Sequence, residues 1–166
     1  MTLIRRITVT VLALLLSMLV ASPALAQKPG AHIVGDLTIT KSLTTGLTVS
    51  GRGAGFGDFV TDAFLTADRV VATWQCRNPG GNIAPGQGTE LTDVVGPTTT
   101  IEPRAGHIDF TVTLPAPPPP DPDVACPNGN WTIDPVPLSL TYVNVVLHFE
   151  QAGEEVLTVS LGTIDP

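Results

Sequence analysis

The residue types that most often carry chemistry are sparse in this chain. It has two cysteines, Cys76 and Cys126, and three histidines among its 166 residues. The cysteines are far apart and neither has a His or Cys neighbour, which makes a poor zinc site. In an exported protein an even number of cysteines favours a disulfide. We therefore expect a Cys76–Cys126 disulfide, with two free thiols or a metal-binding pair as the alternatives.

Two pairs of polar residues could hold a metal ion or transfer a proton. His107 and Asp109 are two positions apart, so on a strand their side chains would share one face. Asp121 and Asp123 could donate oxygens to calcium, which takes about six to eight oxygen ligands. A solvated strand face and a charged loop explain the two pairs more simply. We predict no catalytic residue, no metal site and no cofactor.

Alternating glycines from Gly51 to Gly57 form the remaining motif with a chemical interpretation. A dinucleotide-binding fingerprint needs a helix directly after its glycines. Here the strand-forming residues 59–61 follow, so the motif predicts a hairpin turn or a bulge. No serine lies in the Gly-x-Ser-x-Gly motif that positions a hydrolase nucleophile.

Amide side chains gather in two long loops, residues 77–89 and 115–130, which lie beside or contain the two cysteines. Amides both donate and accept hydrogen bonds, and an exposed aromatic ring adds apolar contact. A disulfide would join the loops into one fixed surface at one end of the domain. The candidate binding residues are Asn78, Asn82, Gln87, Asn128, Asn130 and Trp131. Alternatively, Trp131 packs on the disulfide and the bridge only restrains the loops.

The scaffold that positions these loops is predicted to consist of strands. Apolar and polar residues alternate in several segments, and Thr and Val, which favour strands, are abundant. The predicted strands are residues 33–40, 44–51, 59–66, 69–76, 90–101, 108–114, 138–150 and 155–161. They predict an all-β fold, an antiparallel immunoglobulin-like β-sandwich of seven to eight strands in a single domain, residues 27–166.

The alternation also assigns faces, and it places a turn at Ala67-Asp68. Two sets are predicted to face the core: Ile108, Phe110, Val112 and Leu114, and Val70, Ala72, Trp74 and Cys76. In the strand at 138–150, one face is predicted to carry Val143, Val145, Leu147 and Phe149, and the other Tyr142, Asn144, Val146 and His148.

The first 26 residues have the layout of a secretory signal peptide. Arg5 and Arg6 form a basic start, an apolar run follows over residues 11–16, and small residues stand at Ala24 and Ala26. The apolar run is too short for a membrane span, which needs about 20 apolar residues. We predict a signal helix over residues 1–26 that is removed after Ala26, and a secreted, extracellular mature chain.

The charge of the mature chain limits the classes of partner that it can bind. Removal of Arg5 and Arg6 leaves six basic residues against fifteen acidic ones. An acidic surface disfavours nucleic acid and anionic membranes, because both need neutralising Lys and Arg. We expect a soluble monomer with no membrane span, whose partner is a protein or a glycan.

Two loop motifs resemble those of a known group of proteins. The first motif is CRNPGGN at residues 76–82 with APGQ at residues 84–87, and the second is CPNGNW at residues 126–131. Together they resemble small secreted proteins of high-GC Gram-positive bacteria. That group has no assigned activity. The resemblance implies export, a β-rich domain and a paired cysteine, and it carries over no catalytic residue.

The predicted function is a secreted, non-enzymatic binding or surface-associated module. The alternative is a secreted hydrolase, or a protease inhibitor that presents the proline-rich loop. That loop contains four consecutive prolines at residues 117–120. Consecutive prolines form a stiff polyproline II segment, which loses little entropy on binding.

The first testable prediction is the mature N-terminus. Protein recovered from the culture medium should begin at Gln27, because cleavage is expected directly after Ala26. The intact mass of the secreted protein measures this. Recovery of the full-length chain from cell membranes would contradict the export prediction.

Overall fold

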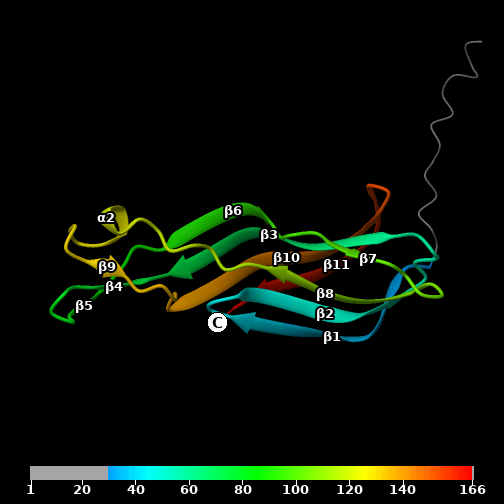
Figure 1. Ribbon diagram of the computed structural model, residues 1–166, viewed down its shortest axis with the longest axis horizontal. Helices are drawn as coiled ribbons and strands as arrows, with labels where there is room; N and C mark the ends of the chain where they lie inside the picture. The colour runs from blue at the N-terminus through cyan, green and yellow to red at the C-terminus, as the bar shows by residue number, and fades with distance from the viewer. Residues whose placement is uncertain (1–29, 166) are drawn as a thin grey trace, which may run out of the picture.

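The computed structural model describes residues 30–165, and the predicted signal peptide at residues 1–26 lies outside them. Two antiparallel sheets pack face to face, and a small third sheet projects from one end (Figure 1). The predicted all-β sandwich is therefore confirmed. Among residues 30–165, none of the helices has the length and apolar character needed to cross a membrane.

The first sheet has three strands in the order β1-β2-β8. They are β1 (His32–Ser42), β2 (Gly46–Ala54) and β8 (His107–Leu114). The second sheet has the order β11-β10-β3-β6, and β7 also pairs with β3. Its strands are β3 (Thr61–Thr73), β6 (Thr89–Val95), β7 (Thr99–Ile101), β10 (Ser139–Gln151) and β11 (Glu154–Ile164).

The third sheet and one short helix form the projecting end. The sheet has the order β5-β4-β9. Its strands are β4 (Gln75–Arg77), β5 (Ile83–Pro85) and β9 (Thr132–Ile133), and the helix is α2 (Pro122–Ala125). Strand β5 and helix α2 lie in the two segments predicted as long loops, whereas β4 overlaps the predicted strand at 69–76 and β9 follows the second loop. The described range holds eleven strands rather than seven or eight.

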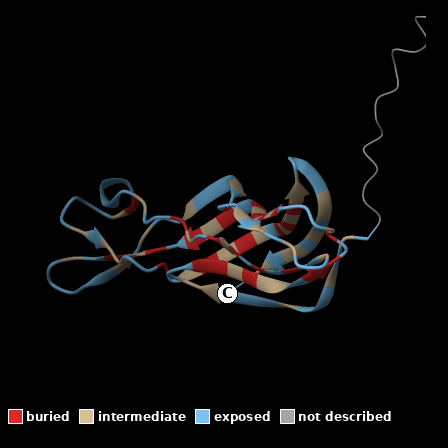
Figure 2. Ribbon diagram, turned by 45° about the vertical axis from the view of Figure 1, so that its right-hand side comes forward, coloured by how far each residue is buried: buried red, intermediate tan, exposed pale blue. Residues whose placement is uncertain are grey.

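The hydrophobic core lies between the two large sheets, where buried residues line the facing strands (Figure 2). The predicted core face of β8 is confirmed, since Ile108, Phe110, Val112 and Leu114 are all buried. The ring of Phe110 meets that of Phe149 from β10 edge-on, with centroids 5.0 Å apart. Aromatic pairs in this geometry stabilise a core beyond the area they bury.

The turn predicted at Ala67-Asp68 is wrong, because β3 runs through it as one strand. The side chains nevertheless change phase there. Alternate residues are buried up to Ala67, two exposed residues follow, and burial resumes at Val70. The phase change lies at the polar residue Asp68. In the sequence it looks like a turn, because a turn also interrupts the alternation with a short polar break.

Strand β10 changes phase at the matching position, which corrects the predicted faces of that strand. Tyr142 is fully buried rather than outward, and Val143 is only half-buried. Asn144 has φ 53°, a left-handed conformation that Asn tolerates better than most residues. Its side-chain amide donates to Asp68 Oδ2 at 2.8 Å. Burial raises the pKa of Tyr142 to about 12, so its phenol stays protonated in the folded chain.

The single strand predicted at 90–101 is divided into β6 and β7. Gly96 causes the division, because its N–H donates to the Leu65 carbonyl and a Cβ there would lie 2.6 Å from the Thr113 carbonyl oxygen. Only glycine fits this close approach, and Pro97 then removes the next backbone donor.

Phe110→Asp should prevent stable folding, whereas the neighbouring Thr111→Asp should be nearly silent. Loss of a buried Phe costs about 3–5 kcal/mol, and an unpaired buried charge adds to it. Thr111 is exposed, where substitutions usually change stability by about 0.5 kcal/mol or less. Denaturant unfolding of both variants measures this. Similar stabilities for the two would contradict the assigned faces of β8.

Candidate functional site

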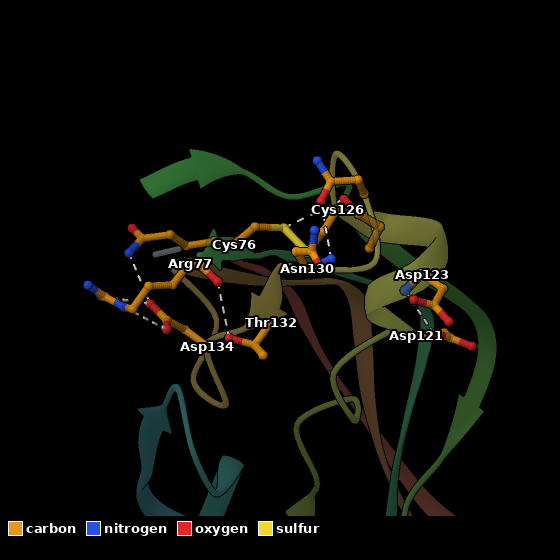
Figure 3. The surroundings of a disulfide bond; sticks show 11 residues. Cys76, Arg77, Asp121, Asp123, Cys126, Asn130, Thr132 and Asp134 are labelled. Carbon is orange, nitrogen blue, oxygen red and sulfur yellow. Dashed lines mark hydrogen bonds and ion pairs between the residues drawn. A yellow bond between two sulfur atoms is a disulfide. The ribbon is translucent and has the colours of Figure 1, made fainter. Parts of the chain in front are cut away.

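The predicted disulfide is present, and it organises the projecting end of the domain. Cys76 in β4 is bonded to Cys126, which directly follows α2, with their Cα atoms 5.8 Å apart (Figure 3). Cys76 is fully buried and Cys126 is half-buried. We call residues 75–88 and 121–134 the disulfide lobe. The S–S bond joins its two segments covalently.

The core anchors the first segment of the lobe. The Trp74 side chain at the end of β3 is buried, as the sequence predicts, and the Trp74 carbonyl accepts from Gly86 N–H at 2.9 Å. A Cβ at Gly86 would lie 3.3 Å from Cys76 Sγ, so the returning chain passes tightly against the disulfide. Gln87 N–H then donates to the Ala125 carbonyl, which ties this chain to α2.

A polar cluster fixes the two segments to each other beside the disulfide. Asp134 accepts from Arg77 Nη2 at 3.2 Å and from Gln75 Nε2 at 2.9 Å (Figure 3). The hydrogen bond and the charge of Asp134 raise the pKa of Arg77. Thr132 Oγ1 donates to the Arg77 carbonyl at 3.2 Å. Sequence reasoning missed this cluster, since nothing in the local sequence of Arg77 and Asp134 indicates that they meet.

The first amide-rich loop, residues 78–82, is a tight hairpin closed by its own amides. Asn78 Oδ1 accepts from Asn82 N–H at 2.8 Å, and the Asn82 carbonyl accepts from Asn78 N–H at 3.1 Å. Gly81 has φ +80°, which glycine adopts without strain. The Asn78 oxygen is therefore used in shaping the loop, while the Asn82 side chain lies exposed beyond it.

The second amide-rich loop, residues 128–131, is closed in the same way. Asn128 Oδ1 accepts from Asn130 N–H, and the Asn128 carbonyl accepts from Trp131 N–H, both at 3.1 Å. Trp131 is half-buried. In the register that pairs Arg77 with Thr132, the next positions along the two chains are Asn78 and Trp131. The two amide-rich loops therefore leave the small sheet side by side.

The structure thus brings all six candidate binding residues into the disulfide lobe. Asn82, Gln87 and Asn130 are exposed, and Asn128 is exposed while its oxygen closes a turn. Asn78 and Trp131 are half-buried. Neither stretch that carries them, residues 78–87 and 126–131, contains a charged side chain. These two stretches of the lobe therefore present an uncharged polar surface on an acidic chain.

The other candidate pairs lie apart from this surface. His107 and Asp109 are exposed on β8, and Asp109 Oδ1 forms an ion pair with Arg52 Nε at 3.0 Å. Asp121 caps α2 by accepting from Asp123 N–H at 2.9 Å, which gives this carboxylate a structural role. Within residues 30–165, no group of three or more His, Cys, Asp or Glu side chains is arranged to hold a metal ion.

The glycine-rich segment forms the end of β2 and the connection to β3. The predicted hairpin turn is wrong, because β2 and β3 belong to different sheets and this connection crosses from one sheet to the other. A Cβ at Gly55 would clash with the Gly30 carbonyl, so this close backbone contact explains one of the glycines.

Comparison with known proteins gives no relative from which a function could be transferred. No protein-family model matches the chain, and no curated protein matches it significantly.

Breaking the disulfide should destabilise the domain substantially. In the chain-entropy model, closing a loop of 50 residues stabilises the fold by about 4 kcal/mol. That is a large part of an ordinary stability of about 5–15 kcal/mol. Thermal unfolding of the protein with and without reductant should show a clear fall in the melting temperature. Full alkylation of the native, unreduced protein would contradict the pairing in solution.

Proposed function

We propose that this protein is a secreted, non-enzymatic β-sandwich that binds a protein or glycan partner through its disulfide lobe. The single observation that carries the proposal is the joining of two amide-rich loops into one projecting surface by the Cys76–Cys126 bond. Secretion is inferred from the signal-peptide pattern of residues 1–26.

Rigidity of the lobe supports a role in binding. Both amide-rich loops are closed by Asn side chains, and the Arg77–Asp134 cluster joins the segments that carry them. A surface that is already ordered loses less conformational entropy when a partner docks. The same loops in a flexible chain would lose that entropy with every binding event.

The absence of charge on the amide surface indicates which partners it fits. Amide groups offer paired donors and acceptors, which match the hydroxyls of a glycan or the backbone of a protein. A nucleic acid would need cations to neutralise its phosphates. We therefore propose recognition by hydrogen bonds and by contact with Trp131, with a weak dependence of affinity on salt.

The alternative function, a hydrolase or an inhibitor presenting the proline-rich loop, receives less support. Pro117 is buried and Pro120 is half-buried, three positions apart, while Pro118 and Pro119 between them are exposed. Three residues make one turn of polyproline II, so this segment lies with one side against the domain. An inhibitory loop would need to protrude. Mixing the protein with general proteases, and separately with ester and glycoside substrates, tests both alternatives.

Trp131→Ala and Asn82→Ala should weaken binding to a partner captured from culture supernatant. Each change removes a contact of the proposed surface, so the dissociation constant should rise by roughly five- to tenfold. Thr111→Ala, an exposed change on β8 outside the lobe, should leave the affinity unchanged. Titration calorimetry with the purified partner measures this.

The melting temperatures of both lobe variants should stay within a few degrees of the parent, because the two side chains lie outside the core cluster. Unchanged affinity in both variants would move the binding site away from the lobe.

A further inference from the structure

The connection between β7 and β8 turns back at the end of the domain opposite the disulfide lobe (Figure 1). A polar hollow lies beside this connection. Its volume is about 460 Å³, which falls within the usual range for small-molecule sites. The lining residues are Arg52, Ile101, Glu102, Arg104, His107 and Asp109. None of them belongs to the disulfide lobe, so the hollow is independent of the function proposed above.

Arg104 is unusual among the four arginines within residues 30–165. The other three form ion pairs: Arg52 with Asp109, Arg69 with Glu90, and Arg77 with Asp134. Within that range, no carboxylate lies within ion-pair distance of the Arg104 guanidinium. A planar guanidinium that is not already paired can take a carboxylate through two parallel hydrogen bonds.

The backbone holds Arg104 and His107 in a fixed relation. Each donates its N–H to the carbonyl of the other, at 2.8 and 3.0 Å, across a turn that contains Ala105 and Gly106. Directly opposed residues of an antiparallel pair place their side chains on the same face. Two donor groups are therefore presented together.

Farther along β8, the face that carries Arg104 and His107 presents hydrogen-bond acceptors instead of donors. Asp109 lies two positions beyond His107, and it stands opposite Arg52 in the β2–β8 register. Glu102 adds a second carboxylate to the hollow, and Ile101 adds an apolar side chain. Anion-binding donors thus lie beside carboxylates that can accept hydrogen bonds from hydroxyl groups.

We propose that this hollow binds a hexuronate, a sugar ring that carries both a carboxylate and several hydroxyls. The carboxylate pairs with Arg104 and accepts from His107, the hydroxyls donate to Glu102 and Asp109, and a C–H face of the ring contacts Ile101. A simple anion gains little here, because the two carboxylates repel it. A neutral sugar leaves Arg104 without a partner.

The affinity should be modest. The side chains of Arg52 and Asp109 are 68% and 81% exposed, so this part of the site is shallow and stays in contact with water. Water screens such contacts, and a single ring at an open site is expected to bind with a millimolar dissociation constant, as roughly 4 kcal/mol of binding energy implies.

Amide chemical-shift titration of the intact mature protein tests the proposal, with sodium glucuronate and sodium galacturonate as the probes. Glucose and acetate are the matched controls, since each carries one half of the hexuronate chemistry. Saturable shifts around residues 101–109 are expected with a uronate and not with either control. An oligogalacturonate that binds more tightly than the single sugar would identify a polysaccharide as the source.

Arg104→Gln should weaken uronate binding by about tenfold, since a charge-assisted pair is lost. The control Arg69→Gln, at an exposed arginine outside the hollow, should bind as the parent does, and both variants should keep the parent's melting temperature. Equal shifts with acetate or glucose, no saturation with either uronate, or an unchanged affinity in Arg104→Gln would each overturn the proposal. The lobe variants Trp131→Ala and Asn82→Ala should not affect this titration.

Discussion

The second sheet depends on one constraint: β3 and β10 must change phase at the same point. A shift in one strand alone would move its apolar side chains to the solvent face while its partner still faced the core. Here the pairs on either side of the shift stay in register, with Val143 opposite Arg69 and Val145 opposite Ala67. Left-handed Asn144 and its bond to Asp68 stand at the break. The sheet therefore keeps the hydrogen bonds between β3 and β10 while the apolar side chains of both strands face the core.

The orientation of the disulfide follows from this phase change. Beyond the break, the even-numbered residues of β3 turn inward, and the same alternation continues through buried Trp74 to buried Cys76. Without the shift, Cys76 would face away from the core and from the half-buried Cys126 that it must meet. The lobe is thus positioned by backbone geometry near Asp68, which lies in the middle of β3.

Sequence patterns predicted the features that depend on local periodicity or on simple counting. The core face of β8 follows from strict alternation, and the disulfide follows from two cysteines in a chain that is predicted to be exported. The phase change was missed because Asp68 interrupts the alternation in the way a turn does. The Arg77–Asp134 pair and the Arg104–His107 turn depend on how distant or looped segments meet. Residue types alone do not determine these contacts, since an arginine on the surface could pair with any of several acidic residues, depending on how the chain folds.

The disulfide has a mechanical consequence for the folded chain. It closes a covalent ring that contains β5, β6, β7 and β8. A pulling force applied through β1 and β11 can separate the sheets, but it cannot extend the chain between Cys76 and Cys126 while the S–S bond holds. Those 50 residues would otherwise add about 170 Å of length to the stretched chain. Under load, the lobe and β8 therefore stay within one covalent ring. The two segments of the lobe remain joined even after the two large sheets have separated.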